Sequence, residues 1–428
     1  MNVRKCFPFL IVLALLGSSC NNDRDSPPDN VSIPGDTDPT DDADDMNPPD
    51  GDNQDTDIVP CVDGMAGIYP CNGFDLVGNV PLSELSANEG NDVWGWVDDA
   101  SGREFALMGL DNGTAFIEIT NSGLLYFGKL PSATGTSIWR DIKVYNDHAF
   151  IVSEAGGHGM QVFDLSRLLE ATDLPITFTA DAIYNGIGTA HNIVINENTA
   201  FAYPVGTARN DAFGGGVHFV DIQNPEAPQA TGGYGLDGYT HDAQIVTYNG
   251  PDPDYQGREI FIGANEDRIA LVDITDKNTP TPIATIDYDQ LGYTHQGWFT
   301  EDQRYFLLGD EVDETRFGFN SRTLIFDFED LDNPTFHMTY LGPSSAIDHN
   351  GYVLGNAFYL ANYTAGLRVL DLSEIDQGVV TEQGFFDSYP ANDTPQFEGA
   401  WSVYPYLPSG KLLVSDINSG LIVIQPSN

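Results

Sequence analysis

Leu367-Arg-Val-Leu-Asp-Leu-Ser373 is a short apolar run that ends in Asp, a pattern typical of a β-strand leading into a turn. The same pattern occurs six more times along the chain, as Ala115-Phe-Ile-Glu-Ile-Thr120, Met160-Gln-Val-Phe-Asp-Leu-Ser166, Val217-His-Phe-Val-Asp-Ile222, Ile269-Ala-Leu-Val-Asp-Ile-Thr275, Thr323-Leu-Ile-Phe-Asp-Phe328 and Leu421-Ile-Val-Ile-Gln-Pro426. Successive copies lie 44 to 57 residues apart, measured at the acidic position. Each repeat is therefore long enough for four short strands with their loops, which is the unit of a β-propeller blade.

The two ends of this repeat series complement each other. The seventh repeat stops at Asn428 with three strands, whereas Phe74-Asp-Leu-Val-Gly-Asn-Val-Pro-Leu82 precedes the first repeat and has no blade of its own. We expect this segment to pair antiparallel with Leu421 to Gln425 as the outer strand of the last blade, which removes an exposed sheet edge. The predicted fold is all-β, a seven-bladed β-propeller over residues 58–428.

Residues 1–19 have the pattern of a signal peptide. Arg4 and Lys5 precede an apolar run from Phe7 to Gly17, which is too short to span a bilayer as a helix. The run ends in Leu16-Gly-Ser-Ser-Cys20, which resembles a lipobox and predicts a lipidated Cys20 at the start of the mature chain. The alternative is a plain secretory signal with a chance cysteine. The lipid interpretation places the protein at the bacterial outer membrane or cell surface, with the membrane as a partner.

Residues 20–57 are predicted to be a disordered, Asp-rich linker that connects this anchor to the propeller. From Asp23 to Asp57 there are thirteen Asp, six Pro and a single basic residue, Arg24. Such a segment cannot bury enough apolar surface to offset its ordering entropy. The full chain carries a formal net charge of −47. This charge excludes nucleic acid as a partner and leaves a protein, a glycan or a cation as ligand.

The cysteines divide into two groups. Cys6 lies in the signal peptide and Cys20 would carry the lipid, so Cys61 and Cys71 remain as an even pair. In an oxidising compartment such a pair predicts a disulfide that closes a short loop. Two ligands alone make a poor zinc site, which is the weaker alternative.

Several motifs resemble the choice-of-anchor B family. The third-strand signature looks like the LVIVD repeat, and the family resemblance rests on Cys61-Val-Asp-Gly-Met-Ala-Gly-Ile-Tyr-Pro-Cys71, Trp139-Arg-Asp-Ile-Lys-Val-Tyr145, Gly238-Tyr-Thr-His-Asp-Ala-Gln244, Tyr293-Thr-His-Gln-Gly-Trp298 and Ala346-Ile-Asp-His-Asn350. The resemblance covers about residues 58–427. It implies a propeller that is attached to the cell surface, and it implies no enzymatic role.

Four histidines occupy one position of the repeat, at the start of the first strand of a blade. They are His191, His241, His295 and His349, and in the second repeat the same position holds Arg140. A polar residue follows each of them, including Asp141 after Arg140 and Asp242 after His241, and Glu398 lies near the last blade. Because first strands line the channel of a propeller, we expect these side chains around one mouth. The turns between second and third strands open on the same face and add Glu154, His158, Glu266, Asp310 and Glu311. Imidazoles ringed by carboxylates form a ligand set that zinc, manganese or iron accepts.

Two functions are consistent with this pattern. The first is a surface binding module without turnover, favoured because the chain has no Gly-x-Ser-x-Gly, HExxH or phosphate-loop motif. The second is a metal-dependent hydrolase or lactonase that uses the histidines and a divalent metal ion. A structural alternative is that the polar column only joins neighbouring blades by hydrogen bonds. The signature residues Asp164, Asp221, Asp273, Asp327 and Asp371 are interpreted as turn formers rather than ligands.

Overall fold

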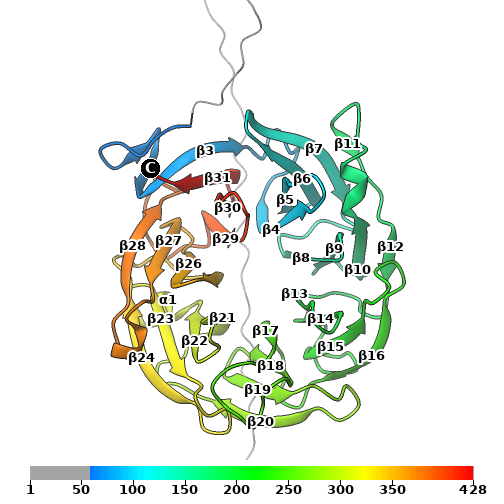
Figure 1. Ribbon diagram of the computed structural model, residues 1–428, viewed down its shortest axis with the longest axis vertical. Helices are drawn as coiled ribbons and strands as arrows, with labels where there is room; N and C mark the ends of the chain where they lie inside the picture. The colour runs from blue at the N-terminus through cyan, green and yellow to red at the C-terminus, as the bar shows by residue number, and fades with distance from the viewer. Residues whose placement is uncertain (1–57, 428) are drawn as a thin grey trace, which may run out of the picture. The chain divides into compact units, whose positions relative to one another are not determined.

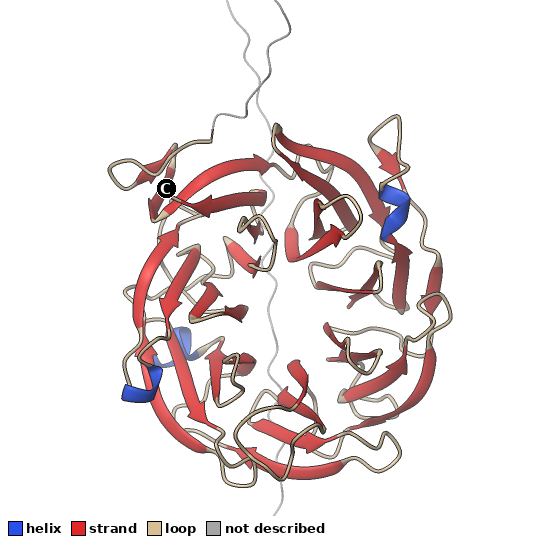
Figure 2. Ribbon diagram, viewed as in Figure 1, coloured by secondary structure: helices blue, strands red, loops and turns tan. Residues whose placement is uncertain are grey.

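The computed structural model describes residues 58–427, which form seven mainly antiparallel sheets arranged around a central axis (Figure 1). The predictions for residues 1–19, for Cys20 and for the linker of residues 20–57 lie outside the described residues. Strands make up nearly all of the regular structure, and the helical segments are short turns at the periphery (Figure 2). Within residues 58–427, no helix is long and apolar enough to cross a membrane.

Each sheet is a blade whose strands follow one another from the axis outward. Blade 1 contains β4 (Gly90–Asp98), β5 (Arg103–Leu110), β6 (Gly113–Thr120) and β7 (Gly123–Pro131); blade 2 contains β8 (Arg140–Tyr145), β9 (His148–Ser153), β10 (Met160–Asp164) and β12 (Ala182–Tyr184); blade 3 contains β13 (Asn192–Asn196), β14 (Phe201–Val205), β15 (Val217–Asp221) and β16 (Gln229–Tyr234); blade 4 contains β17 (Asp242–Thr247), β18 (Glu259–Ala264), β19 (Ile269–Asp273) and β20 (Thr281–Ile286). The order first, second, third, fourth strand is the one that the repeat predicted.

The remaining blades follow the same plan. Blade 5 contains β21 (Thr294–Phe299), β22 (Tyr305–Asp310), β23 (Arg322–Asp327) and β24 (Thr335–Leu341); blade 6 contains β25 (Gly351–Leu354), β26 (Ala357–Ala361), β27 (Leu367–Asp371) and β28 (Thr381–Phe386); blade 7 contains β29 (Ala400–Tyr404), β30 (Leu412–Asp416), β31 (Gly420–Pro426) and β3 (Phe74–Val80). The helical segments are η1 (Leu165–Leu168), α1 (Asp313–Phe317) and η2 (Ile375–Gln377).

The predicted closure of the propeller is confirmed. Strand β3 pairs antiparallel with β31, with Phe74 opposite Pro426 and Val80 opposite Leu421. The chain end therefore contributes three strands of blade 7 and the N-terminal segment contributes the fourth, as the strand count required. The pairing covers the outer edge of β31 that would otherwise be open to another chain.

The segment before β3 does more than the sequence indicated. Cys61 and Cys71 are joined by a disulfide, as predicted. Between and beside them, β1 (Met65–Ala66) and β2 (Tyr69–Asn72) form a hairpin, and β2 pairs with β28. The N-terminal segment thus extends blade 6 before it completes blade 7, and it holds two blades at the closing point.

The longest repeat interval also has a structural explanation. After β10, the chain leaves blade 2 through η1 and forms β11 (Ile176–Thr177), which pairs in parallel with β7 of blade 1. Only then does the chain return to blade 2 as β12. This excursion accounts for the 57-residue spacing between the second and third signatures.

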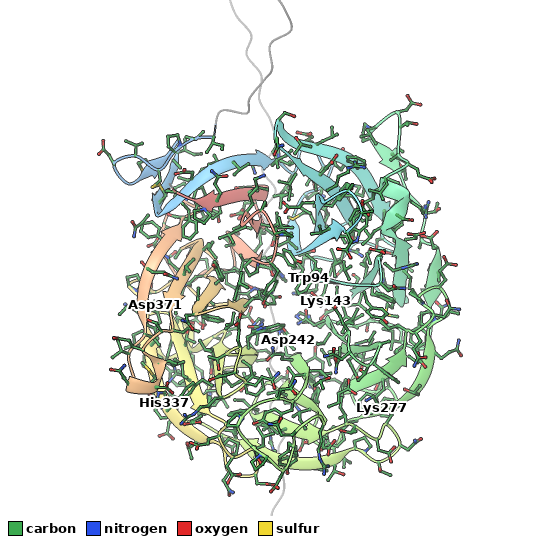
Figure 3. All side chains as sticks on the ribbon, viewed as in Figure 1. Trp94, Lys143, Asp242, Lys277, His337 and Asp371 are labelled. Atoms are coloured by element: carbon green, nitrogen blue, oxygen red, sulfur yellow. A yellow bond between two sulfur atoms is a disulfide. The ribbon has the colours of Figure 1, made fainter. Side chains whose placement is uncertain are left out.

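The packing between blades is apolar, and the signature aspartates lie outside it. The third strands supply fully buried side chains such as Leu271, Phe326 and Val369. The carboxylates of Asp164, Asp221, Asp273, Asp327 and Asp371 each accept a hydrogen bond from the backbone N–H two residues further on. This is the side-chain-stabilised turn that was predicted for them. Figure 3 shows Asp371 at the periphery, whereas Trp94, Lys143 and Asp242 face the centre.

Candidate functional site

A pocket of about 510 Å³ lies at the end of the channel where the inner strands begin. We call it the histidine mouth. Its lining residues are Asn88, Glu89, Gly90, Ile138, Trp139, His191, His241, His295, Glu311, His349, Tyr363, Phe397, Glu398, Trp401, Ile417 and Asn418. The prediction that the four histidines share one mouth is therefore correct. They form an arc contributed by blades 3 to 6, and aromatic and acidic side chains from the other blades complete the wall.

The histidines of this arc are close neighbours. The ring centroids of His191 and His241 are 4.1 Å apart, and the next two steps, to His295 and then to His349, are 4.5 Å each. All four side chains are buried, with exposures between 2 and 9%. Adjacent imidazoles are therefore near enough to share one ion.

Local backbone structure places these rings. The backbone N–H of His241 donates to Ala264 O, and that of His349 donates to Ala361 O, so each ring starts from a position fixed by the second strand of its blade. The pairing of β21 with β22 shifts register between Thr294 and Gln296. His295 is the residue that the ladder skips, and such a bulge turns a side chain away from the regular alternation.

His241, His295 and Glu311 come closest to a metal-binding geometry. Each offers one ligand atom, and these atoms all lie within 4.8 Å of one another. The His241 Nε2 and His295 Nδ1 atoms are buried and have no hydrogen-bond partner. Glu311 also lies 3.6 Å from His349, measured between Oε1 and Nε2. Unpartnered buried nitrogen atoms are costly, so a ligand that accepts their lone pairs would remove a penalty.

Outer contacts orient several of these groups. His191 Nδ1 lies 2.7 Å from Glu154 Oε1, and Tyr293 Oη lies 3.0 Å from His241 Nδ1. His349 Nδ1 donates to the carbonyl of Trp401. A hydrogen bond at Nδ1 fixes the ring and leaves Nε2 as the free electron-pair donor, which is the common arrangement around protein metal sites.

The electrostatics favour neutral imidazoles. Burial lowers the pKa of His349 to about 3. Burial, together with the neighbouring imidazoles, lowers the pKa values of His241 and His295 well below the ordinary value. Burial raises the pKa of Glu311 to about 7. Three rings of the arc are therefore uncharged at neutral pH, which is the form that binds metal.

The other residues predicted for this site have different positions. Glu398 lies in the histidine mouth and accepts a hydrogen bond from Asn418 Nδ2. Arg140 is buried, donating from Nε to Leu110 O and contacting His158 Nε2 at 3.0 Å through Nη1. Neither Arg140 nor His158 lines the pocket, so the prediction that they reach the mouth is wrong. Their side chains instead fill the space between blades 1 and 2.

The predicted acidic ligands also separate. Glu154 contacts the side chain of His191, and Glu266 accepts a hydrogen bond from Tyr293 Oη. Asp310 accepts hydrogen bonds from Tyr288 Oη and from the backbone N–H groups of Gly292 and Tyr293, so it is occupied in fixing a loop. Asp310 does not line the pocket, whereas its neighbour Glu311 does, together with Glu89 and Glu398.

Asp141 and Asp242 line a second cavity further along the channel rather than the mouth. Asp141 Oδ2 accepts the backbone N–H of Ile193 in the next blade at 2.7 Å, and Asp92 Oδ2 accepts that of Ile142 in the same way. Asp141 and Asp92 therefore join neighbouring blades by hydrogen bonds, which is the structural alternative that the sequence also allowed.

Two further groups of candidate metal ligands lie in the described part of the chain. They are His148, Asp164 and Glu226, and Asp252, Asp330 and Asp332. Asp164 and Asp330 accept backbone N–H groups in tight turns, and Asp252 accepts the N–H of Leu331. Their carboxylates already stabilise loops, and several of these residues are exposed, so the buried cluster at the mouth is the stronger candidate.

Sequence reasoning missed the tyrosines of this site. Tyr363 Oη donates to Glu311 Oε1 at 2.9 Å, and Tyr363 is almost completely buried. Tyr293 joins His241 to Glu266. The Tyr293-Thr-His295 motif held part of the signal, because it places Tyr293 two residues before a histidine of the column.

Comparisons with known proteins show the fold alone. No protein-family model matches the chain, and no curated protein matches it. Among solved structures, the chain is similar to the β-propeller domain of Cps50 (Swd1) from Myceliophteria thermophila, with a TM-score of 0.53 and 10% sequence identity. The match covers 83% of this chain and 100% of that domain. At this identity the likeness supports the β-propeller architecture and carries no function.

Proposed function

We propose that this propeller binds a divalent transition-metal ion at the histidine mouth. The observation that carries the proposal is the cluster of His241, His295 and Glu311, in which two buried imidazole nitrogens have no partner. Neutral imidazole and carboxylate are ligands for zinc, manganese and iron. Ligands around a zinc ion are up to about 4 Å apart, so small side-chain rotations would complete the cluster.

The second coordination layer supports the same proposal. Glu154 contacts Nδ1 of His191, and Tyr293 contacts Nδ1 of His241. Tyr363 holds Glu311. Such outer partners are expected where rings must present a free nitrogen in a set direction. A column of histidines that only joined blades would use both ring nitrogens in protein contacts.

Elemental analysis of the purified full chain tests the proposal. We expect a transition metal near one equivalent per chain, or saturable uptake of Co²⁺ with visible absorption after treatment with a chelator. The double variant His241→Ala/His295→Ala should lose this uptake. His337→Gln is the matched control, because His337 lies at the periphery and contacts Ile375 O. Wild-type protein that neither contains nor takes up a transition metal would contradict the proposal.

Metal-dependent hydrolysis is a second candidate function. The pocket beyond the histidines has room for a small organic molecule and has aromatic walls at Trp139, Phe397 and Trp401. If His241, His295 and Glu311 held a divalent ion, that ion would supply Lewis acidity for an ester or lactone carbonyl and for a water molecule. Assays with simple lactones and aryl esters, with the metal-loaded and the chelated protein, separate this function from metal binding alone.

We also propose that the protein is a lipoprotein at the bacterial outer membrane or cell surface, as the resemblance to choice-of-anchor B proteins implies. The support is the sequence from Leu16 to Cys20 and the acidic segment after it. Mass spectrometry of the mature protein should find a diacyl or triacyl modification on an N-terminal Cys20. An unmodified N-terminus at another residue would contradict the anchor, and protease treatment of whole cells tests the outward placement.

A further inference from the structure

A second cavity lies further along the same channel. It has a volume of about 320 Å³ and is lined from all seven blades by Trp94, Asp141, Lys143, Val144, Asn192, Ile193, Val194, Ile195, Glu197, Asp242, Ala243, Gln244, Ile245, Gln296, Trp298, Asn350, Tyr352, Tyr404 and Tyr406. We call it the aromatic chamber. Glu197 is exposed in the turn after β13, whereas His191 precedes the same strand. The chamber is therefore displaced from the histidine mouth toward the finishing ends of the inner strands.

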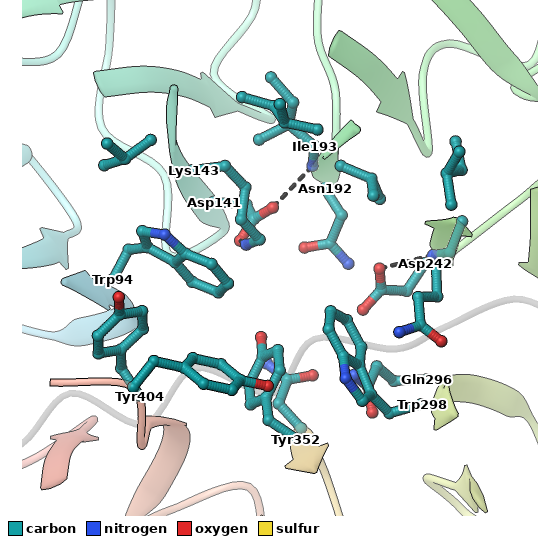
Figure 4. A pocket seen from close by; sticks show the side chains of 18 of the residues that line it. Trp94, Asp141, Lys143, Asn192, Ile193, Asp242, Gln296, Trp298, Tyr352 and Tyr404 are labelled. Atoms are coloured by element: carbon teal, nitrogen blue, oxygen red, sulfur yellow. Dashed lines mark hydrogen bonds and ion pairs between the residues drawn. The ribbon is translucent and has the colours of Figure 1, made fainter. Parts of the chain in front are cut away.

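One wall of the chamber is a continuous group of aromatic rings. Trp298 and Tyr352 have centroids 4.9 Å apart, Trp94 and Tyr404 have centroids 5.0 Å apart, and Tyr404 and Tyr406 have centroids 5.4 Å apart. All three pairs meet edge to face, the arrangement that the ring quadrupoles favour. Figure 4 shows Trp94, Tyr404, Tyr352 and Trp298 side by side along one edge of the cavity. This wall is apolar and fixed by its own packing.

The facing wall is polar. Figure 4 shows the side chains of Asp141, Asn192 and Asp242 opposite the aromatic rings. Asp141 is occupied, because it accepts Ile193 N–H and pairs with Lys143 Nζ at 2.7 Å. Asp242 accepts only the N–H of the adjacent Ala243 among the hydrogen bonds of the described residues, and the buried Asn350 Oδ1 has no partner. Asp242 therefore offers unused acceptor capacity across from the aromatic face, and Asn350, which directly precedes the strand of Tyr352, offers a second unpaired acceptor.

The combination indicates a ligand with one apolar face and several hydroxyl groups. Aromatic rings stack on the C–H face of a pyranose, and carboxylate and amide groups bond to its hydroxyls. An organic cation is less well suited, because Lys143 Nζ already lies 4.5 Å from the centroid of Trp94 and supplies the positive charge there. An anion would face the carboxylates of Asp141 and Asp242. The volume lies within the range of small-molecule sites.

We propose that the aromatic chamber is a saccharide-binding site that accepts a single pyranose unit. Asp242 and Asn350 bind hydroxyl groups, and Trp298 and Tyr352 form the stacking surface. The inference is independent of the metal ion, because none of these four residues lines the histidine mouth. It adds a neutral ligand to a channel whose other end offers metal ligands.

Saturation-transfer NMR and tryptophan fluorescence on the full chain test this site. The probes are the methyl glycosides of glucose, galactose, mannose and N-acetylglucosamine, with tetramethylammonium as the cation probe. We expect at least one glycoside to bind with a dissociation constant on the order of 1 mM. Asp242→Asn should weaken that binding by roughly tenfold, since an amide replaces the carboxyl group that bonds to the hydroxyls. Trp298→Phe should weaken it by a smaller factor.

Two controls make the outcome decisive. Trp139→Phe and Glu398→Gln change the histidine mouth and should leave glycoside binding unchanged. Each variant is first shown to melt at the temperature of the wild type, so that lost binding is not lost fold. Binding of none of the glycosides, binding of tetramethylammonium in their place, or glycoside binding that survives both Asp242→Asn and Trp298→Phe would overturn the proposal. Metal uptake is measured in parallel, so failure of this site is distinguishable from failure of the metal site.

Discussion

At the starting ends of the inner strands the propeller channel is lined by imidazole and carboxylate groups, whereas a few residues further along it is lined by indole and phenol rings. The chamber residues lie mostly on the seven inner strands, β4, β8, β13, β17, β21, β25 and β29, whereas most mouth residues lie just before these strands or in loops. His295 faces the mouth, its neighbour Gln296 lines the chamber, and so does Trp298. Adjacent sequence positions therefore form two chemically different sites.

The comparison of the mouth with the chamber shows how residues at equivalent positions of the seven repeats form one site. One column holds Asn91, Arg140, His191, His241, His295, His349 and Trp401, and the column three residues later holds Trp94, Lys143, Val194, Gln244, Trp298, Tyr352 and Tyr404. All seven members of the later column line the aromatic chamber. Because each blade supplies one member of each column, the propeller converts positions that are about 50 residues apart in sequence into neighbours around one axis.

The largest expected effect is that of opening the propeller, which should destroy both sites together. A chain that starts at Asn88 lacks β3, so β31 becomes an exposed edge and we expect unfolding or aggregation. A chain that lacks only residues 21–57 retains every strand of the seven sheets and should melt like the full chain. Circular dichroism melts compare the two. If the chain starting at Asn88 melts as cooperatively as the full chain, at a similar temperature, β3 does not close the propeller.

Lys143 should separate stability from metal binding. Its Nζ pairs with Asp141 at 2.7 Å and lies 3.7 Å from Asp92, and all three side chains are almost fully buried. Lys143→Met leaves two buried carboxylates without their cation, which should lower the free energy of unfolding by about 3–5 kcal/mol. Urea denaturation measures this loss, and metal affinity of the folded variant should be unchanged. A loss comparable to that of an exposed pair, under about 1 kcal/mol, would contradict this role.

A change at Glu154 should have the opposite result, because it should alter metal affinity and leave stability nearly unchanged. The Glu154 side chain is partly exposed and contacts His191 Nδ1, so Glu154→Gln should leave the melting temperature nearly unchanged. The same change should weaken metal affinity by up to about 10-fold, since Glu154 orients His191, and His191 packs against the proposed ligand His241 with 4.1 Å between ring centroids. Competition with a chromogenic chelator gives the affinity. Glu398→Gln is the matched control at the rim of the mouth, and equal affinities for the two variants would argue against an orienting role.

A pH-dependent effect concerns the buried carboxyl group of Glu314 in α1. Burial, reinforced by repulsion from Asp313, raises the pKa of Glu314 to about 9. The folded protein thus keeps a proton that the unfolded chain loses above about pH 4.3. The contribution of Glu314 to stability is therefore greatest at low pH, and it falls as pH rises toward 9. Glu314→Gln should reduce the fall in unfolding free energy between about pH 5 and about pH 8. An unchanged pH dependence would contradict this assignment.

Much of the fold was predictable because it repeats. Seven signature strands and one unmatched N-terminal strand determined the number of blades and the closing pair, and local turn chemistry explained residues such as Asp371. The added strands were not predictable, because β11 and β2 are very short and pair with blades other than their own. Such pairings depend on which edge is open in space, and the sequence pattern does not encode that.

The candidate site was predictable in its histidines and less so in its partners. The shared column placed His191 to His349 at one mouth, but Arg140 of the same column turns into the space between blades and bonds to Leu110 O. Whether a column residue faces the axis depends on its length and on the free acceptors around it. The aromatic chamber was missed because its column mixes Trp, Tyr, Lys, Val and Gln and so has no recurring letter.

Anomalous diffraction from crystals of the full chain, grown with Co²⁺ or Zn²⁺ and measured on both sides of the metal absorption edge, tests the central claim most directly. We predict one strong peak about 2.0–2.2 Å from ring nitrogens of His241 and His295 and from a carboxylate oxygen of Glu311. No peak at these residues, or a peak only at a peripheral group such as Asp252, Asp330 and Asp332, would contradict it.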